Sequence, residues 1–135
     1  MFYNCENLKS VSMPNAKLYN ADYMFYKCKN ITSKEAIQNI NLRNIYYANK
    51  MFTGCNLNKE AVMYIVSEMQ NCTSVSSSTK LGLGLHKSLK NDADIQQLIA
   101  TGKAGKWNLD ISFTDDDEVS SLNSRYYDDS NITSL

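Results

Sequence analysis

The stretch MFYKCKNI at residues 24–31 returns as MFTGCNL at residues 51–57, and a third version, MFYNCENL, occupies residues 1–8. The Met-Phe pairs of the two internal copies lie 27 residues apart. Self-similarity with a period of about 20 to 50 residues is typical of repeat proteins, in which each unit buries its apolar face against its neighbours. This recurring segment therefore decides the expected fold.

Each copy contains a cysteine, so the repeat fits either a site of cysteine chemistry or a buried structural position. The four cysteines are widely spaced and none forms a C-x-x-C pair, whereas zinc and dithiol sites need ligands on one tight turn. The chain also has a single histidine, His86. We therefore predict no metal and no cofactor, and we expect the thiols to act as small buried apolar groups. The cysteines are Cys5, Cys28, Cys55 and Cys72.

Apolar residues recur at matching positions in the two aligned units. Residues 8–13 alternate apolar and polar side chains, which predicts a short strand that ends at Pro14. The following segment spaces its apolar residues at about one helical turn, which predicts a short helical or 3₁₀ return segment. The matching pairs are Met13 and Ile40, Leu18 and Ile45, Ala21 and Ala48, Phe25 and Phe52, and Cys28 and Cys55.

Residues 58–114 depart from the repeat. Asn58 is a suitable N-cap for a helix with apolar residues at i, i+3 and i+4 spacing. Residues 79–86, TKLGLGLH, predict a half-buried strand whose glycines allow another backbone to approach closely. A second helix is expected from about Asp92 and a last strand over residues 106–113. Right-handed crossovers between these strands would give a parallel sheet.

Residues 18–28 follow the pattern Leu-x-x-Ala-x-x-Met-Phe-x-x-Cys, and residues 45–55 repeat it with Ile in place of Leu. This pattern resembles the BspA-like leucine-rich repeat of bacterial surface and prophage tail-associated proteins. The resemblance implies an α/β fold, a right-handed leucine-rich-repeat solenoid. Its short parallel strands would alternate with short helical return segments, and two longer helices would lie near the C-terminus. Residues 1–57 would form the repeats and residues 58–114 the end of the solenoid.

Composition limits the function classes. A chain of 135 residues fits one domain, and 14 basic side chains balance 14 acidic ones, so nucleic-acid binding is not expected. No apolar segment is long enough to span a membrane and no signal peptide is evident, so membrane insertion is not expected. The resemblance implies that the protein lies at a cell surface, is secreted, or is associated with a virion as part of a longer protein or assembly.

Catalytic patterns are not evident. His86 has no serine or cysteine beside it in a recognisable nucleophile motif, and a lone histidine is more often a surface or capping residue. The Gly82-x-Gly84 pair lies inside a predicted strand and lacks the third glycine of a dinucleotide-binding turn. The sequence therefore predicts that the protein is not an enzyme.

Tyrosines are concentrated in the repeat half of the chain. Tyrosine offers a large contact area at a low entropic cost, which favours a recognition surface for a protein or glycan ligand. The same side chains could instead cover the repeat interior with their hydroxyls at its rim. The alternative function is a structural spacer or assembly domain that packs on a neighbouring chain through its N-terminal edge. The candidate partner-binding residues are Tyr3, Tyr19, Tyr23, Tyr26, Tyr46 and Tyr47.

Residues 115–135 are acidic and serine-rich. Few apolar side chains are available there for packing, so we expect a flexible tail. A calcium loop is the alternative, but the alternating D-x-D-x-D-G spacing of such loops is absent.

Overall fold

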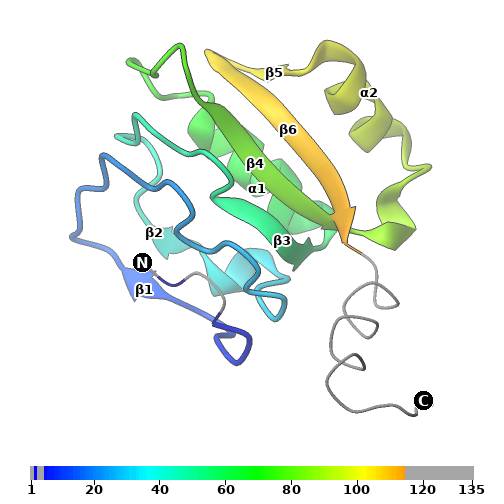
Figure 1. Ribbon diagram of the computed structural model, residues 1–135, viewed down its shortest axis with the longest axis horizontal. Coiled ribbons are helices and arrows are strands. Elements are labelled where there is room, and N and C mark those ends of the chain that lie inside the picture. The colour runs from blue at the N-terminus through cyan, green and yellow to red at the C-terminus, as the bar shows by residue number, and fades with distance from the viewer. Residues whose placement is uncertain (1, 3–4, 115–135) are drawn as a thin grey trace.

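The computed structural model describes residue 2 and residues 5–114, and the predicted flexible tail lies outside the described residues (Figure 1). The helices are α1 (Lys59–Met69) and α2 (Ala93–Thr101), with two 3₁₀ turns, η1 (Lys34–Ala36) and η2 (Lys87–Leu89). The strands are β1 (Ser12–Met13), β2 (Asn39–Ile40), β3 (Phe52–Leu57), β4 (Lys80–His86), β5 (Lys103–Ala104) and β6 (Trp107–Thr114).

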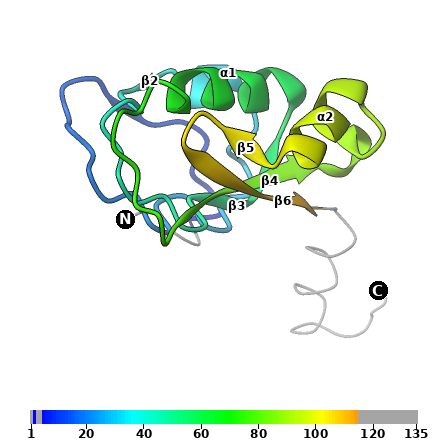
Figure 2. The ribbon, with the colours of Figure 1, turned by 90° about the horizontal axis from the view of Figure 1, so that it is seen from above.

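These strands form two sheets. The larger has the order β3-β4-β6-β5, with β3, β4 and β6 parallel and β5 antiparallel to β6. Helices α1 and α2 lie on the same side of this sheet, so neither of the helices that the structure describes covers its other face (Figure 2). We call that second face the open face. Strands β1 and β2 pair in parallel as a separate two-stranded sheet.

The prediction of a right-handed leucine-rich-repeat solenoid is wrong. The described residues instead form a small mixed α/β fold, with two helices, a four-stranded sheet of mixed orientation and a two-stranded parallel sheet. The recurring segment ends at Leu57, and the chain then builds an 11-residue helix and long strands that have no counterpart in the first units. The hairpin of β5 and β6 also breaks the uniform strand direction that a solenoid needs.

The predicted helical return segments are also wrong. Residues 21–27 contain no helix, and alternate amides of this stretch donate to carbonyls of residues 47–53 in the next unit at 2.8 to 2.9 Å. Tyr23 and Lys27 have left-handed φ angles of 59° and 60°, which a right-handed helix cannot contain. The strand predicted over residues 8–13 shrinks to Ser12–Met13.

The helices and strands predicted after the repeat are present, but residues 81–85 of β4 are all buried, so the prediction of a half-buried strand is wrong. Helix α1 begins after Asn58, whose side-chain oxygen accepts a hydrogen bond from the Ala61 amide at 2.9 Å. Strands β4 and β6 are present, parallel, and joined in register from Lys80 with Asn108 to His86 with Thr114. The crossover between them contains α2, which begins after Asp92.

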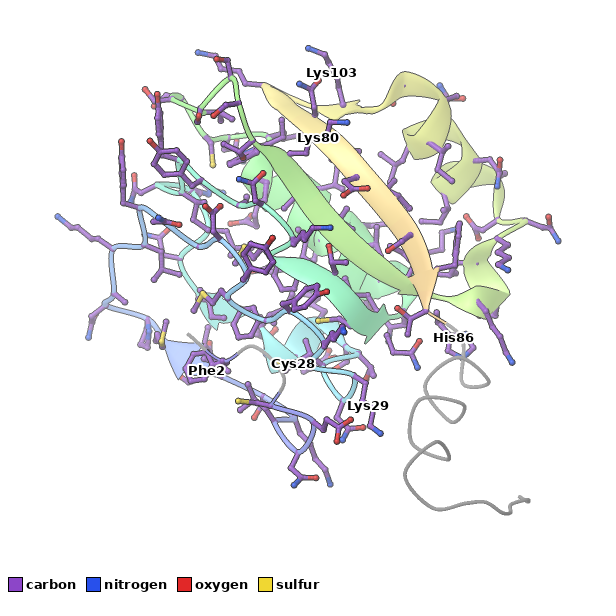
Figure 3. The ribbon with its side chains drawn as sticks, in the orientation of Figure 1. Phe2, Cys28, Lys29, Lys80, His86 and Lys103 are labelled. Carbon is purple, nitrogen blue, oxygen red and sulfur yellow. The ribbon has the colours of Figure 1, made fainter. Side chains whose placement is uncertain are left out.

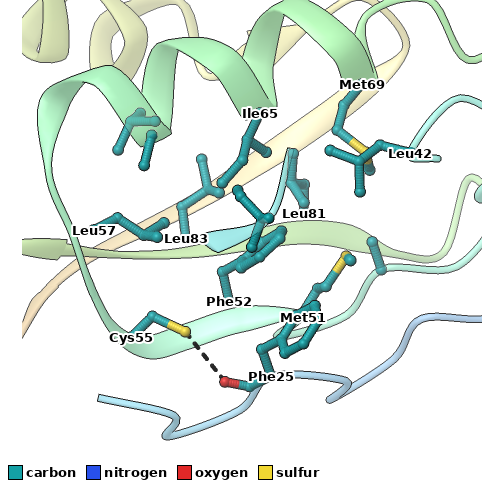
Figure 4. Packing of buried hydrophobic residues seen from close by; sticks show 14 of the residues in the cluster. Phe25, Leu42, Met51, Phe52, Cys55, Leu57, Ile65, Met69, Leu81 and Leu83 are labelled. Carbon is teal, nitrogen blue, oxygen red and sulfur yellow. Dashed lines mark hydrogen bonds between the residues drawn. The ribbon is translucent and has the colours of Figure 1, made fainter. Parts of the chain in front are cut away.

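A stack of phenylalanine rings joins the repeated units. The Phe2 and Phe25 ring centroids are 5.7 Å apart, and those of Phe25 and Phe52 are 5.4 Å apart, with near-parallel planes. Above this stack, Leu81 and Leu83 of β4 pack beneath the apolar face of α1, as Figure 4 shows. One core therefore connects the repeated segments to the four-stranded sheet and to α1.

The glycines of β4 allow the close backbone approach that the sequence predicts. A β-carbon built on Gly82 would lie 2.5 Å from Lys50 Cα, and one built on Gly84 would lie 2.6 Å from the Gly54 nitrogen. Strand β3 has an irregular register between Phe52 and Leu57, so this part of β3 bulges over β4. Backbone from β3 and the turn before it therefore covers the open face of β4 at Gly82 and Gly84, whereas Lys80 on the same face is exposed.

Asp92 links the two helices and should make stability depend on pH. Its carboxylate caps α2 and lies 3.0 Å from Lys59 Nζ on α1. The ion pair and hydrogen bond with Lys59 lower the pKa of Asp92 below its ordinary value of 3.8. A lowered folded-state pKa stabilises the protein above pH 3.8, and this stabilisation is lost as the pH falls through the folded-state pKa.

Asp92→Asn should keep the cap, because asparagine and aspartate are similarly good N-caps, but lose the charge. We expect its melting temperature to lie a few degrees below that of the wild type at pH 7 and to match the wild type near pH 2. Asp92→Ala, which also loses the cap, should melt below Asp92→Asn at both pH values. A pH-independent difference between wild type and Asp92→Asn would contradict the role of the ion pair.

Candidate functional site

The structure places five of the six predicted tyrosines, while Tyr3 lies outside the described residues. Tyr19 and Tyr23 are 59% and 43% exposed, and Tyr26, Tyr46 and Tyr47 are half-buried. The five side chains form two groups rather than one continuous strip. None of the five is a fully buried core residue.

The first group, which we call the tyrosine cluster, contains Tyr19, Tyr46 and Tyr47. Tyr19 stacks on Tyr46 with ring centroids 5.1 Å apart, and Tyr47 meets both rings edge-on at 5.7 and 4.9 Å. The Tyr19 carbonyl accepts hydrogen bonds from the amides of Tyr46 and Tyr47 at 2.8 and 3.1 Å. Backbone bonds and ring contacts thus hold the same three residues.

The second group contains Tyr23 and Tyr26, whose rings meet edge-on at 5.2 Å. Lys27 Nζ lies 5.3 Å from the Tyr26 ring centroid, within the range of a cation–π contact. The left-handed φ angle of Tyr23 sets the direction of its side chain. This group therefore combines two tyrosine rings with one lysine charge.

A side-chain ladder supports the backbone next to the tyrosines. Asp22 Oδ1 accepts from the Asn49 amide at 2.7 Å, and Asn49 Oδ1 accepts from the Lys80 amide at 3.1 Å. Asp22 and Asn49 occupy equivalent positions, 27 residues apart, as Tyr19 and Tyr46 do. Sequence reasoning missed this ladder, although the shared 27-residue register of short polar side chains was a visible signal.

The Tyr19 hydroxyl favours neutral hydrogen bonding over charge. Loss of solvent around Tyr19, together with the neighbouring phenols of Tyr47 and Tyr46, raises the pKa of Tyr19. Its hydroxyl is therefore protonated at neutral pH and can both donate and accept a hydrogen bond. The exposed ring adds an apolar surface, so the tyrosine cluster can bind amphipathic groups such as sugar rings or peptide side chains.

The cysteines are structural hydrogen-bond donors. The Sγ atoms of Cys28 and Cys55 donate to the carbonyls of Phe2 and Phe25 at 2.9 and 3.2 Å, so each thiol bonds to the preceding unit. Cys72 likewise donates to the Leu42 carbonyl at 3.3 Å. Burial raises the pKa of all three thiols, which keeps them protonated and weakens them as nucleophiles.

Thiol labelling should separate Cys5, which is exposed, from the three buried cysteines. We expect iodoacetamide at pH 8 to add one label per folded chain and four labels in 6 M guanidinium chloride, with intact mass as the measurement. Peptide mapping should assign the first label to Cys5. Rapid labelling of Cys55 in the folded protein would contradict its burial and its raised pKa.

Other candidate chemistry has a structural explanation. His86 caps η2, because its Nδ1 accepts from the Ser88 amide at 3.1 Å, as expected for a capping residue. Within residues 5–114, no group of three or more His, Cys, Asp and Glu side chains is arranged to hold a metal ion. Among the helices that the structure describes, none is long and apolar enough to cross a membrane.

No protein-family model matches the chain, and neither the curated proteins nor the solved structures contain a match.

Proposed function

We propose that the protein is a non-catalytic interaction or adhesion module that binds a protein or glycan ligand through the tyrosine cluster. The observation that carries this proposal is the stacking of Tyr19, 59% exposed, on Tyr46. Single apolar side chains are common at a protein surface, whereas a contiguous group of them that reaches solvent is typical of an interaction site. Tyr19 belongs to such a group, and other aromatic residues hold its exposed ring in place.

Pre-organisation makes this surface suitable for binding. A ring already fixed by stacking loses little conformational freedom when a ligand binds, so more of the contact energy appears as affinity. The Asp22–Asn49–Lys80 ladder fixes the adjoining backbone in the same way. The repeat resemblance supports a setting at a cell surface, in secreted material or on a virion, where adhesion modules act.

Tyr19→Ala tests the proposal. Wild-type protein should bind members of a printed glycan array or an array of purified extracellular proteins, and Tyr19→Ala should lose that binding by roughly tenfold or more. The free energy of unfolding should fall by only about 1 kcal/mol, the value of an aromatic pair at a mostly exposed site. Urea denaturation provides that second measurement.

Met63→Ala is the matched control, because Met63 is an exposed large apolar residue on α1, 38% accessible. It should leave binding unchanged. If the wild type binds nothing on either array, or if Tyr19→Ala unfolds the protein, the tyrosines are structural. The spacer or assembly function then becomes the better interpretation.

A further inference from the structure

The outer edge of β6 is a second surface, separate from the tyrosine cluster. Strand β5 pairs only with Trp107 and Asn108 of β6, and the Leu109 amide donates to the Gly102 carbonyl at 2.9 Å. Because amides alternate in direction along a strand, the amides and carbonyls of Ile111 and Phe113 also point outward. Within the described part of the chain, no backbone hydrogen bond uses these outward groups.

Two lysines, which we call the lysine row, flank the N-terminal end of β6 on the open face, before the part of the strand whose outward groups are unpaired. The sheet register places Lys80 of β4, Asn108 of β6 and Lys103 of β5 side by side. Figure 3 shows Lys80 and Lys103 near each other at one end of β4 and β6. Both lysines are exposed, and neither joins an ion pair with another described residue.

Charge is unevenly divided along the chain. Residues 1–114 contain 13 basic and eight acidic side chains, whereas residues 115–135 contain six acidic side chains and one arginine. Residues 1–114 therefore carry a net charge of +5, which the net charge of −5 in residues 115–135 cancels. The lysine row lies within this basic part, and it favours a ligand that brings carboxylates.

We propose that the β6 edge binds an extended acidic peptide of a partner protein by strand addition. The outward amides and carbonyls can bond to water in the free protein, but a polypeptide is the ligand that continues the hydrogen-bond ladder, so they favour an extended peptide. The lysine row favours carboxylates at the end of the peptide that lies nearest to Asn108. A second copy of β6, with the sequence WNLDISFT, offers a single carboxylate and fits the row poorly.

Asp110 limits where those carboxylates lie. It is exposed on β6 two residues after Asn108, and the register places it opposite Gly82 on the open face. An acidic side chain opposite Asp110 would be repelled, since like charges on neighbouring strands destabilise a sheet. The bound peptide should therefore carry its acidic residues at one end, beside Lys80 and Lys103, followed by a neutral extended stretch.

The test uses fluorescein-labelled ten-residue peptides in which four glutamates precede or follow an alternating Val-Thr stretch, measured by fluorescence anisotropy. One of the two peptides should bind the full chain, and its identity gives the strand direction. Lys80→Glu with Lys103→Glu should weaken binding by roughly tenfold or more. Lys9→Glu with Lys17→Glu makes the same charge change at exposed residues of the N-terminal part and should have little effect.

Two further measurements test the hydrogen-bond ladder and the contribution of charge. N-methylation of alternate peptide amides blocks the ladder without altering the protein, and it should abolish binding. Full-length protein with the six acids of residues 115–135 changed to Asn or Gln should bind more tightly, because repulsion is removed. Equal binding of the N-methylated peptide or of polyglutamate would overturn strand addition. Failure of both peptides to bind either protein, or dimerisation through the edge instead, would also overturn it.

Discussion

Phe25→Ala is expected to lower the free energy of unfolding by about 3 to 5 kcal/mol, the usual loss when a core aromatic residue is truncated. Phe25 is fully buried and lies between the rings of Phe2 and Phe52, so its removal leaves a cavity in the middle of the stack. Urea denaturation followed by circular dichroism would measure the change.

Phe2→Ala is the matched control, because Phe2 belongs to the same stack but is only half-buried. Its loss should be clearly smaller. If Phe25→Ala costs less than Phe2→Ala, the stack does not join the units as the structure shows.

Gly84→Ala is expected to destabilise the protein by about 3 kcal/mol, at the upper end of the usual range for overpacking a core. The added β-carbon would lie 2.6 Å from the Gly54 nitrogen, 2.8 Å from the Cys55 oxygen and 2.9 Å from the Phe52 oxygen. All three are backbone atoms of the bulged part of β3, so no side chain can rotate away. Chemical denaturation would measure the loss.

Gly102→Ala separates crowding from backbone conformation. Gly102 caps α2 with a left-handed φ of 65°, but its added β-carbon would meet only the Ile99 oxygen, at 4.0 Å. That variant should lose about 1 kcal/mol, from conformational strain alone. A loss for Gly84→Ala no larger than for Gly102→Ala would show that β3 can move away from β4.

Sequence reasoning succeeded where local signals and periodicity agreed. Asn58 and Asp92 are N-caps followed by apolar residues at helical spacing, and α1 and α2 begin directly after them. The alternating leucines of residues 79–86 likewise predicted β4. In these segments the local residue preferences and the spacing of buried residues indicate the same secondary structure, so the segments can be predicted from one sequence.

The recurring positions of the repeat were identified correctly, but the backbone conformation predicted for them was wrong. Met24 and Phe25 lie at helical spacing from Ala21 and Cys28, and all four are buried. The left-handed φ angles of Tyr23 and Lys27 turn the backbone so that these four side chains are buried without a helix. Gly54, at the position equivalent to Lys27, has a φ of 83° and was the one visible sign of this conformation.

The candidate partner-binding tyrosines stay a prediction, and the sequence did not predict how they are arranged. The number and position of the tyrosines indicated a surface, and five of them are at least partly exposed. Their division into the tyrosine cluster and the Tyr23–Tyr26 pair depends on which backbones lie side by side. The two-residue strand β5, which leaves most of the β6 edge unpaired, is too short to produce a pattern in the sequence.

The hydrogen bonds between the first two complete units also bear on the order of folding. The four amides of residues 21, 23, 25 and 27 each bond to a carbonyl 26 residues further along the chain. The entropy lost on closing a loop depends mainly on its length, so each of these bonds carries nearly the same closure penalty. None of these four hydrogen bonds is favoured to form first. Once one of them has formed, the two segments are already side by side, so the other three form without closing another long loop. This part of the chain should therefore assemble in a single kinetic step, and the local turns of α1 are the natural place for folding to begin.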